Sequence, residues 1–223
     1  MSKTLAILGG SGVGMIAADI AITDEIYGYE NIVFLNDSVP SGLYIGKYKR
    51  FPVVGSSRDT KRLLSDKNID FFVAFFVLGK ERDTLRKILS LALPPDRQPT
   101  LVHPSAALNL EFCRVGHGCL IGPNAIIGPD VCLENNSIVL GGGFIGHNSS
   151  LKFRAHVATN AVVGANVQIG AGAHIGSNST IRERINIGDC ALVGAGSTVI
   201  NDVSPDETVV GTPARPLRRV TAS

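Results

Sequence analysis

The C-terminal half of the chain repeats one apolar position every six residues. From residue 115 to residue 199, each sixth residue is Val, Ile or Leu without a break. Neither the helical period near 3.6 nor the strand period of 2 produces a lone spacing of six, so each aliphatic residue marks one short strand and one corner of a parallel β-helix. The markers are Val115, Ile121, Ile127, Leu133, Val139, Ile145, Leu151, Val157, Val163, Ile169, Ile175, Ile181, Ile187, Val193 and Val199.

Small residues accompany these markers at fixed offsets. Nine markers are followed directly by Gly, which suits a corner that needs positive φ or leaves no room for a Cβ atom. Four residues after most markers stands a small residue, such as Cys119, Ala125 or Ser137, of a size that fits a narrow interior. The pattern therefore predicts stacked coils with the aliphatic and small side chains inside.

The N-terminal half alternates strand and helix patterns. Strands are predicted at residues 4–8, 32–35, 52–55, 71–76 and 100–106, with helices near 15–26, 59–65 and 80–91. This order predicts a small doubly wound α/β domain over residues 1–108, followed by the β-helix over residues 109–223.

Composition excludes several classes of function. The 223 residues carry a formal charge of +2, with no long Lys/Arg run, so neither a nucleic-acid footprint nor a membrane-surface patch is expected. Apolar stretches are too short to cross a bilayer, and no signal peptide is recognised, so we expect a cytoplasmic protein without membrane insertion. The cysteines lack metal-ligand spacing, which predicts reduced thiols and no metal: Cys113, Cys119, Cys132 and Cys190.

A glycine-rich loop separates the first predicted strand from the first helix. Glycines there let a phosphate approach the backbone, and the helix N-terminus offers free N–H groups. The spacing is not that of the dinucleotide motif, and a tight turn without a ligand gives the same pattern. Asp37 ends the second strand, where a carboxylate of such folds often reaches a ribose or base. The predicted substrate-binding residues are Gly10, Ser11, Gly12, Val13, Gly14, Asn36 and Asp37.

The glycine-rich α/β half, the His103-Pro104-Ser105-Ala106 bridge and the hexapeptide repeats together resemble one family over nearly the whole chain. That family is the nucleotide-sugar N-acetyltransferases of the bacillosamine and perosamine type, with sialic acid O-acetyltransferases as relatives. The resemblance implies a Rossmann-like domain followed by a left-handed β-helix with three hexapeptides per turn. Five coils then give a prism roughly 24 Å tall at normal strand spacing. It also implies a homotrimer that uses acetyl-CoA between adjacent prisms.

The resemblance also implies a catalytic base. The family's base lies in a segment similar to residues 141–148, which places His147 at that position. A neutral imidazole can take a proton from an attacking sugar amine. An acidic residue often follows the base in relatives, whereas this chain has Asn148, an amide that can hydrogen-bond the ring but brings no charge. An exposed corner histidine without a function is the alternative reading.

Further positions are expected to hold acetyl-CoA. His156 matches a family position near the reactive end of the cofactor, and His174, one coil further, is expected to stack on it and to depress both pKa values. Arginines at the exit segment suit the phosphates of the cofactor, although a solvated basic tail is equally ordinary. The expected cofactor-binding residues are His156, Ala165, Gly194, Ala195, Gly196, Arg215 and Arg218.

The function expected from the resemblance is transfer of acetyl from acetyl-CoA to the amino group of a nucleotide-linked sugar. The expected acceptor is a UDP-4-amino-4,6-dideoxy sugar used in surface-polysaccharide biosynthesis. Two alternatives stay open: O-acetylation of sialic acid or a related sugar, and a non-catalytic nucleotide-binding trimeric scaffold. A zinc hydratase is disfavoured by the histidine spacings, and a dehydrogenase is disfavoured because nothing in the prism serves hydride transfer.

Overall fold

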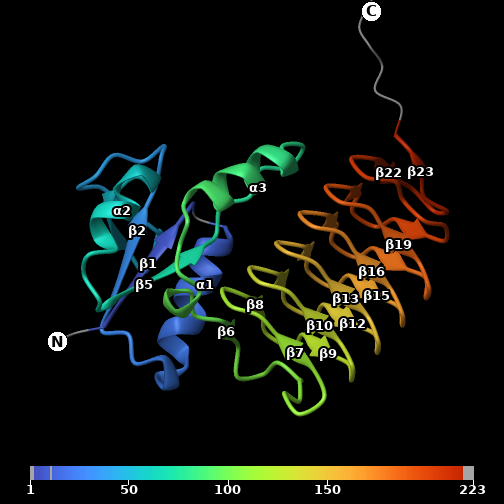
Figure 1. The fold of residues 1–223 in the computed structure, drawn as a ribbon, viewed down its shortest axis with the longest axis horizontal. Coiled ribbons are helices and arrows are strands. Elements are labelled where there is room, and N and C mark those ends of the chain that lie inside the picture. Colours follow the sequence, from blue (N-terminus) through green and yellow to red (C-terminus); the bar gives the residue numbers. More distant parts are fainter. Residues whose placement is uncertain (1–2, 11, 218–223) are drawn as a thin grey trace, which may run out of the picture. The chain divides into compact units, whose positions relative to one another are not determined.

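The computed structural model describes residues 3–10 and 12–217. The chain divides into two compact units, Met1–Pro104 and Ser105–Ser223. Sequence patterns set the boundary after residue 108, close to this division. Figure 1 gives the order of the elements along the chain.

The first unit is built on a mainly parallel sheet with the strand order β3-β4-β2-β1-β5. Pairing is parallel from β4 through β2 and β1 to β5, and only the edge strand β3 runs antiparallel to its neighbour. The central strands are apolar on both faces: Leu5 and Phe34 are fully buried, as is Phe71. The strands are β1 Thr4–Leu8, β2 Asn31–Leu35, β3 Tyr44–Ile45, β4 Phe51–Gly55, β5 Ile69–Val73 and β6 Leu101–Val102.

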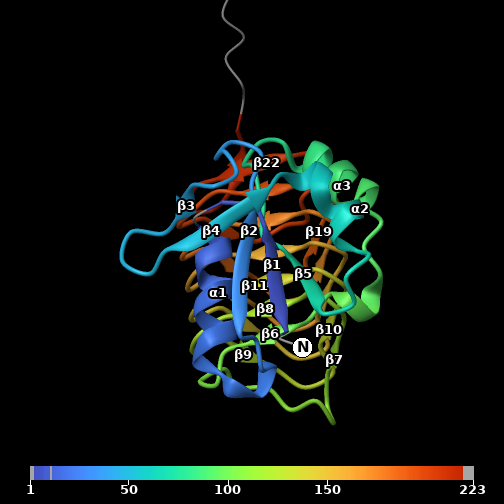
Figure 2. The same cartoon turned by 90° about the vertical axis from the view of Figure 1, so that its left-hand side faces the viewer.

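Helices connect these strands, as the alternating pattern predicts. Figure 2 shows β2, β1 and β5 side by side, with α1 at one edge of the view and α2 and α3 at the other. The predicted elements are present, but the bounds differ: the expected helix at 15–26 becomes a helix and a separate 3-10 turn. The helical elements are α1 Val13–Thr23, η1 Glu25–Tyr27, η2 Ser57–Asp59, α2 Thr60–Leu63, α3 Glu81–Ser90 and η3 Pro95–Arg97.

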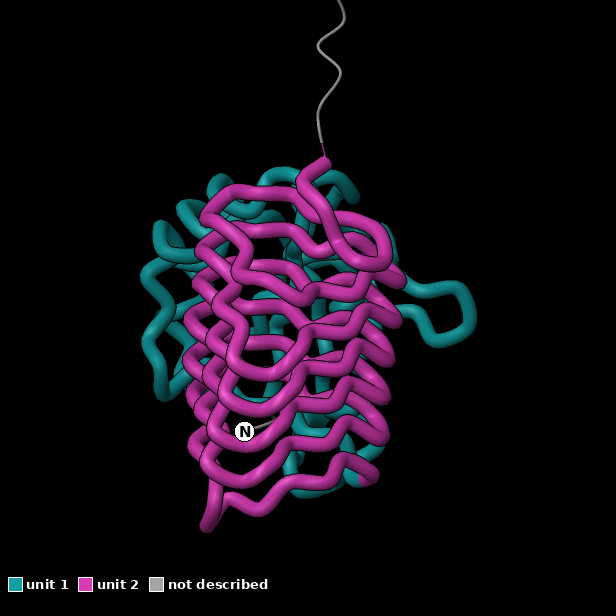
Figure 3. The backbone as a smooth tube through the Cα atoms, turned by 90° about the vertical axis from the view of Figure 1, so that its right-hand side faces the viewer, with its two compact units in different colours: residues 1–104 teal, residues 105–223 magenta. Residues whose placement is uncertain are grey.

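The second unit is a left-handed parallel β-helix, as expected. Each strand pairs in parallel with the strand 18 residues later, for example Ile127 with Ile145, so three hexapeptides make one turn. Figure 3 shows the stacked coils. The strands are β7 Arg114–Val115, β8 Leu120–Ile121, β9 Ile126–Ile127, β10 Cys132–Leu133, β11 Ile138–Val139, β12 Phe144–Ile145, β13 Ser150–Leu151, β14 His156–Val157, β15 Val162–Val163, β16 Gln168–Ile169, β17 His174–Ile175, β18 Thr180–Ile181, β19 Asn186–Ile187, β20 Leu192–Val193 and β21 Thr198–Val199.

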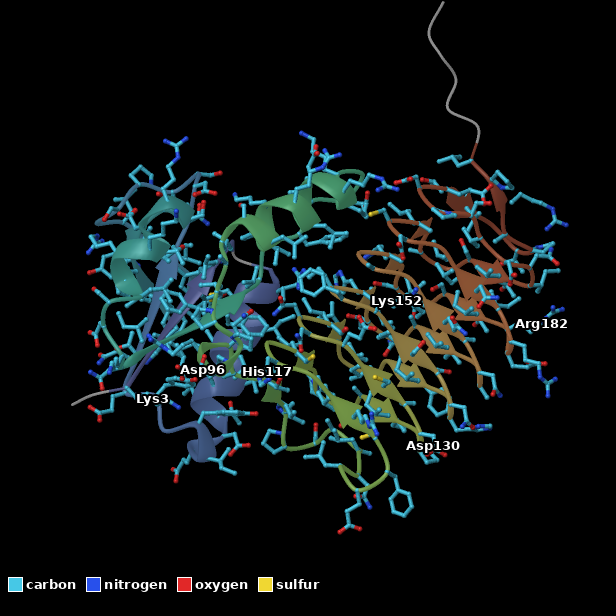
Figure 4. All side chains as sticks on the ribbon, in the orientation of Figure 1. Lys3, Asp96, His117, Asp130, Lys152 and Arg182 are labelled. Carbon is cyan, nitrogen blue, oxygen red and sulfur yellow. The ribbon has the colours of Figure 1, made fainter. Side chains whose placement is uncertain are left out.

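The interior of the β-helix confirms the six-residue pattern. Every marker from Ile121 to Val199 is buried, as are Cys119 and Ala125 at the small-residue position. Charged side chains such as Arg182 extend outward (Figure 4). Beyond the fifth coil the chain adds β22 Thr208–Val210, and β23 Arg215–Pro216 pairs with it in an antiparallel manner.

The corners resolve the two reasons offered for glycine. The left-handed backbone falls three residues after each marker, at Asn124, Asn148 and Arg154 among others, with φ near 60°. The glycine directly after the marker has another purpose, because a Cβ on Gly146 would lie 2.6 Å from the backbone of Gly164 in the next coil. Glycine there permits close stacking of coils, whereas asparagine supplies the left-handed turn.

No helix within the described residues is long and apolar enough to cross a membrane.

Candidate active site

His147 stands at an exposed corner of the β-helix, directly after β12. Its Nδ1 lies 2.7 Å from Oδ1 of Asn148. An amide oxygen only accepts hydrogen bonds, so Nδ1–H of the imidazole donates and the neutral ring keeps its lone pair on Nε2. Asn148 holds the left-handed position of the corner, with φ at 58°. The pair thus fixes one tautomer and leaves the other ring nitrogen able to accept a proton.

Ala165 occupies the same corner one coil further along. The backbone N–H of Asn166 donates to the carbonyl of His147 at 2.9 Å, which ties the two coils together. The small side chain of Ala165 leaves the space beside the imidazole open. The structure therefore brings together two predicted site residues, His147 and Ala165.

His156 and His174 stack on adjacent coils, as the 18-residue spacing predicts. Their Nδ1 atoms are 3.2 Å apart, and the rings meet edge to face with centroids 4.8 Å apart. Burial, His174 and Arg154 hold the pKa of His156 well below its usual range, and burial lowers the pKa of His174 to about 4. The pair is therefore neutral at physiological pH. The side chain of His156 is 5% exposed, and its contact with acetyl-CoA stays a prediction.

A second group of predicted cofactor residues lies at the far end of the β-helix. Gly194, Ala195 and Gly196 form the corner after β20. The exit segment runs beside them, since the N–H of Thr198 donates to Gly211 and that of Ala214 donates to Thr198. Arg215 in β23 is exposed, whereas Arg218 lies outside the described residues. This group and His147 occupy different corners of the prism, three coils apart along the repeat.

The glycine-rich loop contains glycines with two different purposes. A Cβ on Gly9 would lie 2.6 Å from the backbone of Phe75, and a Cβ on Gly14 would lie 2.9 Å from the ring of Phe34. Those two glycines are required by packing. Gly10 has nothing nearer than 4.0 Å and Gly12 faces open space, so packing explains neither of them.

The remaining residues of the loop frame these open positions. Val13 is the first residue of α1, and Gly12, which precedes it, makes no side-chain capping hydrogen bond. Ser11 lies outside the described residues.

Asn36 and Asp37 follow β2 and border the same loop. Asn36 donates to the carbonyl of Gly9 at 2.6 Å and accepts from the N–H groups of Ser38 and Val39, which shapes the chain beyond the strand. Asp37 accepts from the backbone and the hydroxyl of Ser57 and forms an ion pair with Lys87. Burial raises the pKa of Asp37, but the hydrogen bonds from Lys87 and Ser57 outweigh it and lower the pKa below its usual value.

These residues surround a pocket of about 370 Å³ at the carboxyl ends of β1, β2 and β5. The pocket unites Gly10, Asn36 and Asp37 with three residues that sequence reasoning missed: Ser57, Phe75 and Lys87. Lys87 lies on α3, 50 residues from Asp37, and a lysine on an exposed helix gives no local signal of such a contact. No group of three or more His, Cys, Asp or Glu residues within the described chain could hold a metal ion.

Comparison with known proteins adds independent support. Residues 4–75 match the family model of the PglD N-terminal domain. A search of curated protein sequences finds no match.

Solved structures cover nearly the whole chain. The acetyltransferase domain of PglB from Neisseria gonorrhoeae is 26% identical, with 97% of this chain and 100% of that chain covered and a TM-score of 0.83. The same domain in complex with acetyl coenzyme A matches at 27% identity, with the same coverage and a TM-score of 0.81. PerB from Caulobacter crescentus, in complex with CoA and GDP-perosamine, shares the fold at 21% identity, with 96% of this chain and 97% of that chain covered and a TM-score of 0.79.

Both halves of the sequence-based resemblance are thereby confirmed. The first unit carries the PglD N-terminal domain over residues 4–75, and the second is a hexapeptide-repeat β-helix. The chain has the architecture of the nucleotide-sugar N-acetyltransferases of the hexapeptide-repeat superfamily.

Proposed function

We propose that this protein is an acetyl-CoA-dependent sugar N-acetyltransferase that uses His147 as its general base. The observation that carries the proposal is the exposed imidazole whose Nδ1 is held by Asn148 at 2.7 Å, leaving Nε2 as the proton acceptor. The likeness to the PglB acetyltransferase domain supports the same chemistry. We expect the reaction to take place in the cytoplasm.

The proposed reaction is direct transfer without an acyl-enzyme. The sugar amine attacks the carbonyl carbon of the acetyl thioester and forms the C–N bond, while the amine proton passes to Nε2 of His147. The C–S bond then breaks, and the proton leaves with the CoA thiolate as the free thiol. Correct placement of the two substrates, together with proton removal by the imidazole, lowers the barrier.

Acetyl-CoA is proposed to contact both groups of predicted residues on the β-helix. His156 and Ala165 are assigned to its reactive end, and the small corner of Gly194, Ala195 and Gly196 to its pantetheine arm. Arg215 is exposed in β23, where a guanidinium can bind phosphate. Arg218 is assigned to the same phosphates on the basis of the sequence alone.

The acceptor is proposed to be a nucleotide-linked amino sugar, with a UDP-4-amino-4,6-dideoxy sugar as the first candidate. The pocket beside Gly10, Asn36 and Asp37 is the proposed site of the nucleotide. Gly12 supports this assignment, because its missing side chain faces open space rather than a packed neighbour. Val13 and Gly14 complete the loop around the proposed site, and Ser11 is assigned to it from the sequence alone.

A homotrimer is part of the proposal. On the face formed by β9, β12 and β15, three apolar side chains stand in register and are exposed: Ile126 by 47%, Phe144 by 38% and Val162 by 40%. His147 follows β12 directly, so this apolar stripe lies beside the proposed base. Contiguous exposed apolar side chains commonly mark protein–protein contacts, and a second copy of the chain would cover them.

The test is a thiol-release assay with acetyl-CoA and a panel of UDP-, dTDP- and GDP-linked 4-amino sugars plus sialic acid, with mass analysis of the products. The wild-type protein is expected to add one acetyl group to one amino sugar. His147→Ala is expected to lower the rate by about 10²- to 10⁴-fold. His117→Ala is the matched control, because His117 is also exposed and stands two residues after its marker Val115.

Other outcomes redirect the assignment. Acetylation of sialic acid alone indicates the O-acetyltransferase alternative, and the absence of turnover on every acceptor favours the scaffold. An unchanged rate in His147→Ala contradicts the role of this residue as the base.

A further inference from the structure

Lys87 is the one cationic residue among those that line the pocket of the first unit, all of which are described. It projects from α3, and its ammonium group forms an ion pair with Asp37. The same Nζ lies 4.7 Å from the centroid of the Phe75 ring, at the end of β5. Two contacts from two different elements therefore hold the charge at the carboxyl edge of the sheet.

Asp37 is already occupied by protein groups. Its Oδ1 accepts the N–H of Ser57 at 2.8 Å, and its Oδ2 accepts the Ser57 hydroxyl at 3.0 Å together with Lys87. Three donors on one carboxylate suit a group that orders its neighbours. The carboxylate thus links η2 to α3 and directs the ammonium group of Lys87.

The other side of the same pocket also favours an anion. Gly9 and Gly10 line it, and the chain then enters α1, whose N-terminal N–H groups and dipole favour negative charge. Gly10 and Gly12 leave room beside the backbone that packing does not require. A cation facing a helix N-terminus across a pocket of about 370 Å³ suits a ligand with adjacent phosphates.

We infer that Lys87 binds the diphosphate of the nucleotide-linked substrate and that Asp37 is the positioning residue that holds Lys87 in place. This inference rests on the proposed function and deepens it, since it names the group of the substrate that the pocket selects. It also changes the expected role of Asp37, from a direct ribose contact to the orientation of a cation.

The test compares ligands that differ only in phosphate number. Calorimetric titrations use UDP, UMP and uridine, and in parallel GDP, GMP and guanosine, with the full-length protein. Lys87→Met is expected to weaken binding of the favoured diphosphate by about ten- to hundredfold and to leave binding of the nucleoside unchanged. Lys87→Arg is expected to restore most of the affinity, and Asp37→Asn to give a smaller loss confined to the phosphorylated ligands.

Arg86→Met is the matched control. Arg86 is the adjacent residue of α3, pairs with Asp83 at 3.1 Å and does not line the pocket. It is expected to bind all ligands like the wild-type protein.

Equal weakening of diphosphate and nucleoside by Lys87→Met overturns the inference, because it indicates a general loss of structure. Full diphosphate affinity in Lys87→Met, or no nucleotide binding by the wild-type protein, overturns it as well. The assay is independent of turnover. Phosphate-dependent binding without an acetylated product upholds the inference and refutes the proposed function, and an acetylated product without a Lys87 effect does the reverse.

Discussion

Asn148 holds the imidazole of His147 through a 2.7 Å contact between Oδ1 and Nδ1 at a left-handed corner of the β-helix. This geometry gives the amide two separate tasks. Asparagine tolerates the positive φ better than most residues do, and its side chain orients the ring. The related enzymes suggested by the sequence often carry a carboxylate here, which would also stabilise a charged imidazolium.

Asn148→Asp separates orientation from charge. A carboxylate favours the protonated ring, so the base is lost at a higher pH, and the acid limb of the pH–rate profile is expected to move to higher pH. The rate at alkaline pH is expected to stay near that of the wild-type protein. The measurement is the initial rate of thiol release across the pH range from about 5.5 to 9.

Asn148→Gly is the companion variant, because glycine accepts φ near 60° without strain and removes the amide. With the ring no longer held, the rate is expected to fall about tenfold at every pH, with no displacement of the acid limb. Identical pH profiles for Asp and Asn at this position would show that the contact does not act on the base.

The sequence predicted the β-helix well because each marker has a strong physical reason to recur. Ile145 and Val163 must stack inside a narrow interior, and a single polar residue there would leave an unpaired group in every coil. The positive φ was assigned to the wrong place for a local reason. Both asparagine and glycine suit corners, and only the coil-to-coil distances distinguish a left-handed turn at Asn148 from close stacking at Gly146.

The α/β half was predicted less completely. The edge strand Tyr44–Ile45 has two residues, too few to show an alternating pattern, and it depends on its pairing with Pro52 and Phe51. Lys87 was missed because helical lysines normally face water. Its partner Asp37 is distant in the sequence, and only the folded sheet brings the two together.

Acid is expected to destabilise the protein through the buried histidine pair. An unfolded histidine titrates near pH 6.5, whereas the pKa of His174 is lowered to about 4 by burial. Between these values the unfolded chain binds more protons than the folded one. The stabilisation is thus complete above pH 6.5 and is lost as the pH falls toward 4, by up to roughly 3 kcal/mol.

His174→Leu tests this sign. Leucine matches Leu192, which pairs with position 174 on the next coil. The free energy of unfolding of the variant is expected to fall less between pH 7 and pH 5 than that of the wild-type protein, with part of the dependence kept by His156. Denaturant unfolding at a fixed protein concentration measures it. An equal fall in both proteins would assign the acid sensitivity to other groups.

The apolar stripe on β9, β12 and β15 predicts the position of the contact between subunits. Phe144→Glu places a charge between Ile126 and Val162, and burying an unpaired charge is costly, so the proposed trimer is expected to dissociate into folded monomers. Light scattering coupled to size-exclusion chromatography measures the mass. Tyr48→Glu is the control, since Tyr48 is 91% exposed in the first unit. A Phe144→Glu protein with unchanged mass would exclude this face as the contact.

The glycine-rich loop allows ligand binding to be separated from packing by two single methyl groups. At Gly12, φ is −75° and an added Cβ meets nothing within 4 Å, so Gly12→Ala is expected to change the free energy of unfolding by less than about 1 kcal/mol. At Gly14 an added Cβ would lie 2.9 Å from the buried ring of Phe34, and Gly14→Ala is expected to destabilise the protein by about 1–3 kcal/mol.

Nucleotide binding is expected to respond in the opposite order. The methyl group of Gly12→Ala occupies the space proposed for the phosphates, and the dissociation constant for UDP or GDP is expected to rise at least about tenfold while nucleosides bind normally. Gly14→Ala is expected to bind both classes normally at temperatures where it is folded, because its side chain is buried against β1 and β2. Since the two substitutions add the same atom two residues apart, opposite effects on stability and affinity would assign one glycine to the fold and the other to the ligand. Normal diphosphate affinity in Gly12→Ala would instead make the whole loop a structural turn.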